Sequence, residues 1–292
     1  MKPRVGITAG DPAGIGPEIA AKAAADPRVL DACEPHLYEV PGSFVMGAVS
    51  AQAGRAAYDA IVRAVEDARA GRIDAIATAP VNKEAFAQAG LPWKGHTDLL
   101  AHLTNTARVA MLFYAEQLRV VLATIHVPLA DVPRLLTRDA ADFTIDITAR
   151  ELPRFGYARP RLAFAGLNPH AGEHGVIGAE DEEVIAPAVA DARERGIDIT
   201  GPWPADTVFG RAMRGEFDAV IACYHDQGLI PVKLLAFGRA VNVTLGLPII
   251  RTSVDHGTAF DIAGRDMADP SSLVEAILLA ARLVARGARR EA

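Results

Sequence analysis

Three histidines follow segments that read as β-strands, each in a stretch rich in turn-forming residues. They are His126, His170 and His225. Imidazole is the commonest protein ligand for divalent transition metals, and three neutral imidazoles leave a coordination position open for substrate. The histidines lie 44 and 55 residues apart in sequence, which matches no local zinc motif. Only a fold that gathers separate loops could assemble a metal site here, and three unrelated loop histidines are the simpler interpretation of the spacing alone.

A second set of residues could bind an acidic substrate. Lys233 follows the His225 segment, Asn242 lies in an expected strand, and Arg251 ends an apolar run. A lysine and an arginine near strand ends suit a phosphate or carboxylate, because arginine can bind two oxygens at once. Either cation could equally be a surface charge, and without further context that interpretation is favoured.

The residues His96 and Thr97 follow Gly95 and open an apolar helical run. We expect Thr97 to cap this helix, because its hydroxyl can accept a hydrogen bond from a free backbone amide. The exposed amides at such an N-terminus also attract anions such as phosphate. An ordinary helix cap without a ligand is the simpler interpretation of this motif alone.

A glycine-rich turn at residues 10–18 follows the first expected strand. Its glycines do not fit the G-x-G-x-x-G pattern, so a Rossmann-type pyrophosphate site is not supported. A tight strand-to-helix turn, with Pro17 in the first helical turn, explains the segment at least as well as a ligand role.

Short β-branched runs alternate with longer alanine-rich runs, which is typical of a parallel sheet with crossover helices. We expect strands at 5–9, 74–79, 109–114, 118–124, 161–165, 217–222 and 241–245. We expect helices at 16–25, 51–70, 139–152, 180–195 and 271–285. The polar, glycine-rich segments follow the strands, where open α/β sheets bind their ligands. This arrangement indicates an enzyme.

The composition excludes several classes of protein. Half of the 292 residues are apolar and the net charge is only -6, which argues against disorder and against an electrostatic nucleic-acid binder. The two cysteines, Cys33 and Cys223, are too few for a disulfide framework or a thiolate zinc site. No apolar stretch approaches the roughly 20 residues of a membrane helix. We expect a cytoplasmic protein without a nucleic-acid or membrane partner.

Taken together, these segments resemble the 4-hydroxythreonine-4-phosphate dehydrogenase family of vitamin B6 biosynthesis. The resemblance covers nearly the whole chain, and its most specific parts are residues 10–18, 95–98, 118–129, 168–173, 201–209 and 224–263. The segment 255–264, with Ala-Asp-Pro at 268–270, is also similar to the adenosine-binding loop of the wider β-decarboxylating dehydrogenase superfamily, which includes isopropylmalate and isocitrate dehydrogenases. This likeness implies NAD or NADP as cofactor without a Rossmann fingerprint.

The resemblance implies an α/β fold with two lobes and a cleft between them, like that of isopropylmalate dehydrogenase. The first lobe would comprise residues 1–97 and 247–292 and carry the cofactor loop, and residues 98–246 would form the second. The second lobe would carry the metal ligands and the dimer interface. The family also implies a homodimer whose metal site is shared between subunits.

The reaction implied by the resemblance is oxidation of 4-phosphooxy-L-threonine at C3, followed by decarboxylation to 3-amino-2-oxopropyl phosphate. The same chemistry on D-threonate or D-erythronate 4-phosphate is the alternative. The resemblance assigns one divalent ion (Zn, Mg, Co or Mn) to His126, His170 and His225. It assigns substrate binding to His96, Thr97, Lys233, Asn242 and Arg251, and cofactor binding to His256, Gly257, Thr258, Ala259 and Asp269. Asp206 and Asp226 are both candidates for accepting the hydroxyl proton, and either could instead orient a metal-bound imidazole.

One segment departs from the family pattern. After residues 37–40 the chain goes almost directly to the helix expected at 51–70, where family members usually carry several tens more residues. The metal motifs lie elsewhere in the chain, so we expect the chemistry to survive. We expect changes at the edge of the sheet or in access to the active site.

Two functions of other classes stay open at this point. Three histidines could form a metal-dependent hydrolase that activates water, although the cofactor-like segment argues against it. The second open function is that of a non-catalytic ligand-binding protein with the same fold. Such a protein should tolerate loss of the metal ligands.

Overall fold

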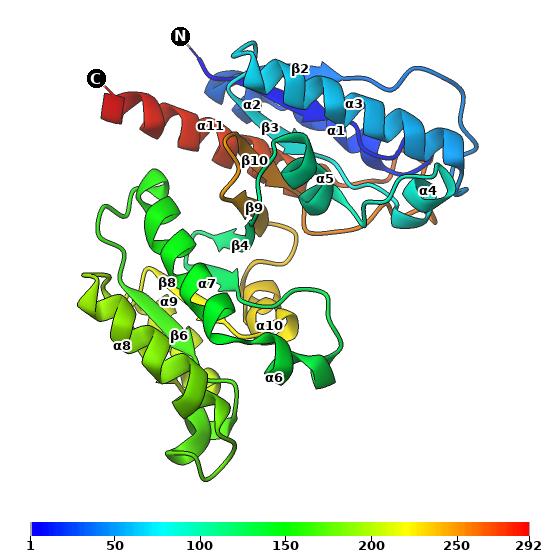
Figure 1. Ribbon diagram of the computed structural model, residues 1–292. Coiled ribbons are helices and arrows are strands. Elements are labelled where there is room, and N and C mark those ends of the chain that lie inside the picture. Colours follow the sequence, from blue (N-terminus) through cyan, green and yellow to red (C-terminus); the bar gives the residue numbers. More distant parts are fainter. Residues whose placement is uncertain (1, 292) are drawn as a thin grey trace. The chain divides into compact units, whose positions relative to one another are not determined.

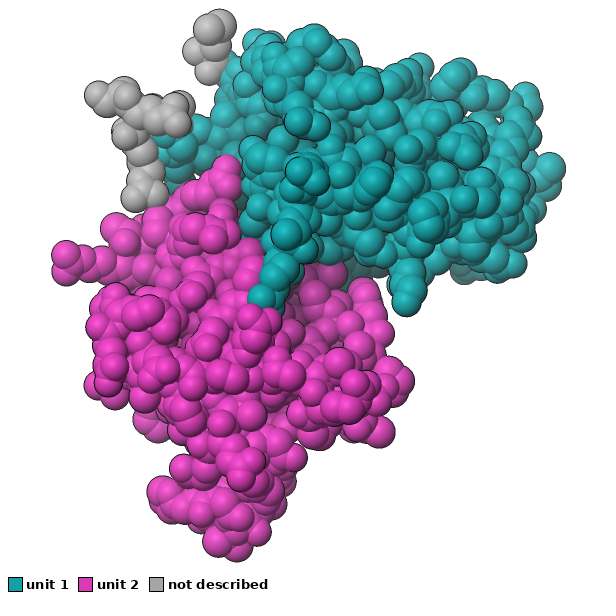
Figure 2. All heavy atoms as spheres, viewed as in Figure 1, with its two compact units in different colours: residues 1–109, 238–292 teal, residues 110–237 magenta. Residues whose placement is uncertain are grey.

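The computed structural model describes residues 2–291, with the backbone alone for 288–291. Two compact units make up the chain (Figure 2). Unit 1 contains the residues up to 109 and those from 238 onward, and unit 2 contains residues 110–237. These units are defined by contacts. The two lobes expected from the sequence, with boundaries at 97/98 and 246/247, are folding domains. The units do not test these boundaries, which stay a prediction.

Unit 1 contains five strands (Figure 1). They are β1 (Arg4–Thr8), β2 (Glu34–Tyr38), β3 (Ala75–Thr78), β9 (Val241–Leu245) and β10 (Ile250–Ser253). Their order across the sheet is β2-β1-β3-β10-β9. The first four in this order are parallel, and β9 is antiparallel to β10. The carboxyl ends of β1, β3 and β10 therefore share one edge of the sheet.

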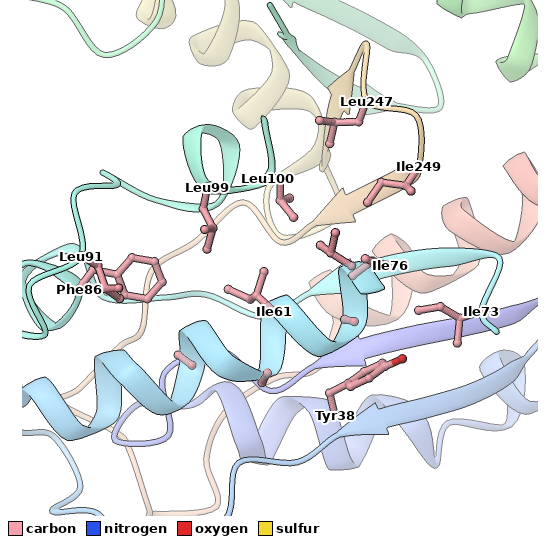
Figure 3. Close-up of a cluster of buried hydrophobic side chains, with 14 residues drawn as sticks. Tyr38, Ile61, Ile73, Ile76, Phe86, Leu91, Leu99, Leu100, Leu247 and Ile249 are labelled. Atoms are coloured by element: carbon pink, nitrogen blue, oxygen red, sulfur yellow. The ribbon is translucent and has the colours of Figure 1, made fainter. Parts of the chain in front are cut away.

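The helices of unit 1 cover its sheet. They are α1 (Gly16–Ala24), α2 (Pro27–Ala32), α3 (Ala51–Arg69), α4 (Lys83–Gln88), α5 (His96–Leu103) and α11 (Ser271–Glu291). On one face, Ile76 of β3 joins a buried apolar cluster with Ile61 of α3 and Leu99 and Leu100 of α5 (Figure 3). On the other face, Thr252 of β10 donates a hydrogen bond to a backbone carbonyl of α11. Neighbouring strand residues thus serve opposite faces, as the alternation of side chains requires.

Local sequence explains the longest of the expected helices. Ser50 Oγ accepts a hydrogen bond from Ala53 N and so starts α3. The buried positions of α3 are mostly alanines spaced three or four residues apart, which form one small-residue face. A Cβ at Gly54 would lie 2.2 Å from Ala85 O, so glycine permits the close approach of α4.

Unit 2 also contains five strands. They are β4 (Ala110–Ala115), β5 (Leu118–Leu122), β6 (Leu162–Ala165), β7 (Ile199–Trp203) and β8 (Ala219–Ala222). Their order is β4-β5-β8-β6-β7, with β5, β8, β6 and β7 parallel. Every residue of β5, β6 and β8 is buried, as in parallel strands covered on both faces.

The α-helices of unit 2 are α6 (Val132–Leu135), α7 (Arg138–Glu151), α8 (Ala186–Glu194), α9 (Ala205–Met213) and α10 (His225–Ala236). Short 3-10 turns lie at Leu129–Asp131, Leu152–Phe155 and Pro169–Glu173, and a π-helical turn at Asp181–Ile185 precedes α8. Within the described residues, no helix combines the length and apolar character that crossing a membrane demands.

The expected α/β class is confirmed, and antiparallel pairs stand beside the expected parallel ones. The strand β4 is antiparallel to β5, and β9 is antiparallel to β10. Only two residues separate β4 from β5 and four separate β9 from β10. Such short connections can join only antiparallel strands, because a parallel pair needs a crossover of a dozen or more residues.

Candidate functional site

The three candidate metal ligands of unit 2 lie at one edge of its sheet. His126 comes four residues after the end of β5, His225 three after β8, and His170 five after β6. These strands are neighbours and parallel, in the order β5-β8-β6. Because the carboxyl ends of parallel strands meet at the same edge, the fold gathers the three loops.

Hydrogen bonds tie these loops to one another. Thr124 Oγ1 donates to Cys223 O at 2.7 Å, which joins the loop after β5 to the loop after β8. The Gln227 amide spans the loops after β8 and β6, since it accepts from Cys223 N and donates to Gly166 O, both at 2.7 Å. The backbone that carries the histidines is therefore cross-linked.

A buried carboxylate organises the loop that carries His170. Asp181 is fully buried and accepts hydrogen bonds from Leu167 N at 2.8 Å and Asn168 N at 3.1 Å. It also accepts from Asn168 Nδ2 at 2.9 Å. Sequence pattern alone does not point to Asp181, because it stands in an acidic run that is typical of an exposed helix start.

Two of the three histidines lie side by side. The ring centroids of His126 and His225 are 5.4 Å apart, at an interplanar angle of 42°. Metal–nitrogen distances of about 2.1 Å place two imidazoles on one tetrahedral ion with centroids about 5 Å apart. The spacing thus fits two ligands of one ion. His225 Nδ1 is hydrogen-bonded to Asp226 Oδ1 at 2.7 Å, which leaves the other ring nitrogen, Nε2, for a metal.

The third histidine does not complete this pair. Among the described residues, no three histidine, cysteine, aspartate or glutamate side chains come together as metal ligands. His170 is exposed. Its backbone φ is 53°, and that of His126 is also 53°. Left-handed backbone is uncommon for residues other than glycine and points to a constraint on the loops.

The other candidate residues of unit 2 belong to helices that follow strands of the same sheet. Asp206 is exposed in the first turn of α9, which follows β7, the neighbour of β6. Lys233 is half-buried in the last part of α10. The structure therefore gives Asp226 a partner in His225, whereas Asp206 faces solvent.

Arg251 forms the centre of a second candidate site, in unit 1. It is 2% exposed on β10, where Nη1 donates to Thr244 Oγ1 at 3.0 Å and Nη2 donates to Thr78 Oγ1 at 2.8 Å. Nε has no hydrogen-bond partner, and no described carboxylate forms an ion pair with Arg251. Burial lowers the pKa of the guanidinium to about 9, so it is still charged at neutral pH. A buried charge without a counter-ion is costly, and a bound anion would remove that cost.

Two other candidate residues of unit 1 also have buried polar atoms without a partner. His96, the first residue of α5, is buried, and its Nε2 has no partner. Burial, followed by the charge of Arg251, lowers the pKa of His96 well below its usual value, so its imidazole is neutral. Asn242 Oδ1 on β9 is likewise buried without a partner. Three elements thus present unpaired hydrogen-bonding atoms, as expected for residues that bind a polar ligand.

The expectation that Thr97 caps α5 is wrong. The helix begins at His96, with Gly95 in the capping position and no side-chain cap. Instead, the Asp98 side chain reaches back and accepts a hydrogen bond from Lys94 N at 2.8 Å. Thr97 is half-buried in the first turn, and its hydroxyl plays no part in starting the helix.

The cofactor-like segment lies against the glycine-rich turn of unit 1. Thr258 O accepts a hydrogen bond from Ile15 N at 3.0 Å, and a Cβ at Gly14 would lie 2.7 Å from the same oxygen. Further along, Glu18 Oε1 accepts from Ala268 N at 2.7 Å. The first turn and the segment that follows β10 are therefore one structural feature, although about 240 residues of sequence separate them.

The remaining candidate cofactor residues differ in their surroundings. His256 and Gly257 are exposed after β10, and Ala259 has a φ of 41°. Asp269 Oδ1 accepts from Ser271 N at 2.9 Å and Ser271 Oγ at 2.6 Å, and these bonds lower the pKa of its carboxyl. Asp269 therefore shapes the turn into α11.

Both units place polar side chains at the carboxyl ends of strands, which is where α/β enzymes bind small, polar ligands. Residues 15–280 match the model of the family described as pyridoxal phosphate biosynthetic protein PdxA. The chain belongs to this family.

Named relatives agree with this result. A 4-hydroxythreonine-4-phosphate dehydrogenase of Desulforapulum autotrophicum is 45% identical over 323 residues, covering 96% of this chain and 95% of the relative. A D-threonate 4-phosphate dehydrogenase of Cupriavidus necator is 44% identical, covering 98% of each chain. The crystal structure of the Klebsiella pneumoniae 4-hydroxythreonine-4-phosphate dehydrogenase has a TM-score of 0.88 at 42% identity, covering 97% of this chain and 98% of that one. The chain is thus an oxidoreductase.

More distant structures share the fold. A β-decarboxylating dehydrogenase of Thermococcus kodakarensis has a TM-score of 0.52 at 17% identity, covering 93% of this chain and 80% of that one. The chain is also shorter than its relatives. Because 96% of 292 residues is about 280, the 323-position alignment leaves about 43 positions without a counterpart here. This number agrees with the several tens of residues expected to be absent between residues 40 and 51.

Proposed function

We propose that the protein oxidises 4-phosphooxy-L-threonine at C3 in vitamin B6 biosynthesis, with the cytoplasm as its location. The hydroxyl carbon gives a hydride to NAD or NADP and the hydroxyl proton goes to a base, which leaves a ketone. The resulting β-keto acid loses carbon dioxide to form 3-amino-2-oxopropyl phosphate. The observation that carries this proposal is the buried guanidinium of Arg251, which has no described carboxylate partner.

The phosphate of the substrate is the anion that suits Arg251. A guanidinium has five N–H donors, and protein hydroxyls accept from two of them. Three donors are therefore left for phosphate oxygens, which arginine can bind in pairs. The neutral imidazole of His96 and the amide of Asn242 would supply further hydrogen bonds, with Thr97 and Lys233 as the remaining proposed contacts.

His126, His170 and His225 would hold a divalent ion, namely Zn, Mg, Co or Mn. When bound, such an ion acts as a Lewis acid that stabilises the alkoxide from which the hydride leaves. Asp226 holds Nδ1 of His225 and so directs Nε2 toward the ion. This contact favours an orienting role for Asp226, and it leaves Asp206 as the candidate for accepting the hydroxyl proton.

We propose a homodimer as the active form, with the metal site shared between subunits. One chain brings only two of the three histidines side by side within the described residues. On α10 and just beyond it, Ile230 is 59% exposed, Leu234 84% and Phe237 85%. An apolar surface of this kind, next to His225 in sequence, suits burial against a second copy.

NAD or NADP is proposed to bind the segment that follows β10. His256, Gly257, Thr258 and Ala259 lie beside the glycine-rich turn of residues 10–18, whose backbone holds Thr258. Asp269, which shapes the start of α11, is the remaining proposed contact. The resemblance to adenosine-binding loops supports this assignment.

The same chemistry on D-threonate 4-phosphate is the second candidate, and D-erythronate 4-phosphate would follow the same course. Relatives named D-threonate 4-phosphate dehydrogenase or its putative form are 44% and 45% identical to this chain. These sugar acids carry the phosphate and the vicinal alcohol but lack the amino group. The Arg251 site would bind the phosphate of either substrate.

NADH formation by the metal-loaded protein separates the two candidates. We expect a higher kcat/KM for 4-phosphooxy-L-threonine than for 4-phospho-D-threonate, with both measured side by side. A preference for the sugar acid would move the enzyme to carbon-source catabolism. Failure to reduce the cofactor with either substrate would contradict the proposed function.

A further inference from the structure

A row of hydroxyl groups crosses the sheet of unit 1 at its carboxyl edge. Thr8 of β1, Thr78 of β3 and Ser253 of β10 are paired in register, and all three are buried. Residues paired in register in parallel strands point to the same face of the sheet. Arg251 lies two residues before Ser253 and therefore shares that face.

Three hydrogen bonds form a directed chain in this row. Arg251 Nη2 donates to Thr78 Oγ1 at 2.8 Å, and Thr78 Oγ1 donates in turn to Ser253 Oγ at 2.9 Å. Ser253 Oγ then donates to the backbone oxygen of Thr78 at 3.2 Å. Thr78 Oγ1 donates its hydrogen to Ser253 Oγ, with a longer contact of 3.4 Å to Thr252 O, so a lone pair of Thr78 Oγ1 accepts the hydrogen bond from Arg251.

A second hydroxyl holds the other arm of the guanidinium. Thr244 Oγ1 accepts from Nη1 at 3.0 Å, so both terminal nitrogens are fixed by neutral acceptors. Two anchor points determine the plane of a rigid, planar group. The N–H bond of Nε, which has no hydrogen-bond partner, therefore points in one fixed direction inside the protein.

Neutral acceptors leave the positive charge of Arg251 intact, whereas a carboxylate would neutralise it. A carboxylate at position 78 would orient Arg251 equally well, but it would neutralise the positive charge and compete with an incoming anion. Hydroxyl groups orient the guanidinium and leave its full charge for the ligand. The unfavourable burial of the charge is then relieved only when an anion binds.

We propose that Thr78, supported by Ser253, is a positioning residue that aligns Arg251 with the phosphate of the substrate. The proposal rests on the proposed function, in which Arg251 binds that phosphate. It assigns a role in binding to two residues that do not themselves carry a charge. Thr78 acts through Arg251, so its loss should weaken phosphate binding and leave cofactor binding intact.

Steady-state kinetics of Thr78→Val and Thr78→Ser test this role. Valine keeps the shape of threonine but removes the acceptor, so we expect the KM for the phosphorylated substrate to rise at least tenfold. The Ki of inorganic phosphate as a competitive inhibitor should rise by a similar factor. The KM for NAD should stay within twofold, and Thr78→Ser should restore both constants to within threefold of wild type. Ser253→Ala should show a smaller change in the same direction.

Thr252→Val is the matched control. Thr252 is also buried on β10, and its hydroxyl donates a hydrogen bond of 2.9 Å to Ala276 O on the opposite face. We expect this variant to lose thermal stability as Thr78→Val does, but to keep the wild-type KM for the substrate. Equal increases in KM in the two variants would show that general loosening of the sheet is responsible and would overturn the proposal.

Arg251→Met separates failure of this proposal from failure of the proposed function. If Arg251→Met leaves the KM for the substrate and the Ki of phosphate unchanged, Arg251 does not bind the phosphate and the proposed function loses its main support. If Arg251→Met raises both constants while Thr78→Val raises neither, the positioning role alone is wrong. Should Thr78→Val fail to fold, the same readouts on Ser253→Ala decide the question.

Discussion

Each of the two candidate sites lies at the carboxyl ends of strands in its own unit, but they are built differently. In unit 1, Arg251, Thr78 and Thr244 belong to the strands themselves and are buried. In unit 2, His126 and His170 lie on exposed loops with left-handed backbone, beyond the strand ends. The first site is fixed by strand register, and the second by hydrogen bonds between loops.

This difference shows what each site still lacks. In the unit 1 site both terminal nitrogens of Arg251 are held by hydroxyl groups, but Nε is unpartnered and the positive charge is uncompensated. The unit 2 site has two imidazoles at a suitable separation, but no third described ligand beside them. We infer that an anion completes the first site, and that a metal ion with a ligand from a second subunit completes the other.

Replacing a metal ligand should give the largest effect. In His170→Ala we expect turnover to fall below detection with the fold and the dimer retained, because His170 is exposed and packs little. NADH formation, circular dichroism and the mass in solution measure these properties. His174→Ala, in the same exposed loop, is the control and should keep wild-type activity. Full activity in His170→Ala would refute the metal assignment.

Replacing the buried cation should separate activity from stability. In Arg251→Met we expect kcat/KM for the phosphorylated substrate to fall by about 10²–10³, the equivalent of about 3–4 kcal/mol. Removing an uncompensated buried charge should leave the melting temperature unchanged or higher. Enzyme kinetics and thermal unfolding check both effects. A large loss of stability would mean that Arg251 serves the fold, and the exposed Arg63→Met is the control.

Removing the carboxylate beside His225 should have a smaller effect than removing a metal ligand. In Asp226→Asn we expect the affinity for the divalent ion to fall by about 10–100-fold, because a neutral amide replaces the charged carboxylate that orients the imidazole. Excess metal should restore most of the turnover. Activity that stays low at saturating metal would instead identify Asp226 as the base.

The smallest effect concerns pH. The pKa of His96 is lowered in the folded protein, mainly by burial, so the unfolded chain binds a proton more readily. Its stabilising contribution is therefore present above the unfolded pKa of about 6.5 and is lost as pH falls below it, by at most about 1.4 kcal/mol per pH unit. Urea unfolding of wild type and His96→Gln between pH 5 and 7.5 should show a flatter dependence in the variant. Identical slopes would contradict the buried, neutral state.

Several elements could be predicted from the sequence because local pattern determines them. The strand expected at 241–245 is β9 with the same bounds, and α3 ends one residue before the expected helix. The strands β2, β7 and β10 were missed. Polar or turn-forming residues interrupt their apolar patterns, such as Pro202 in β7 and Arg251 in β10.

The site could be predicted only in part. The residue types at strand ends, together with a family resemblance, pointed to the histidines and to Arg251. The roles of Asp181 and Thr78 were invisible, because each depends on contacts across the fold. Thr78 meets Ser253 across 175 residues of sequence, and no local pattern links two hydroxyl groups at that separation.

Both the proposed function and the role of Thr78 depend on the claim that Arg251 binds the phosphate of the substrate. The most direct measurement compares kcat/KM for 4-phosphooxy-L-threonine and unphosphorylated 4-hydroxy-L-threonine in wild type and in Arg251→Met. We predict that the wild type prefers the phosphorylated substrate at least 100-fold and that the variant loses most of this preference. An equal preference in the two proteins would contradict the claim.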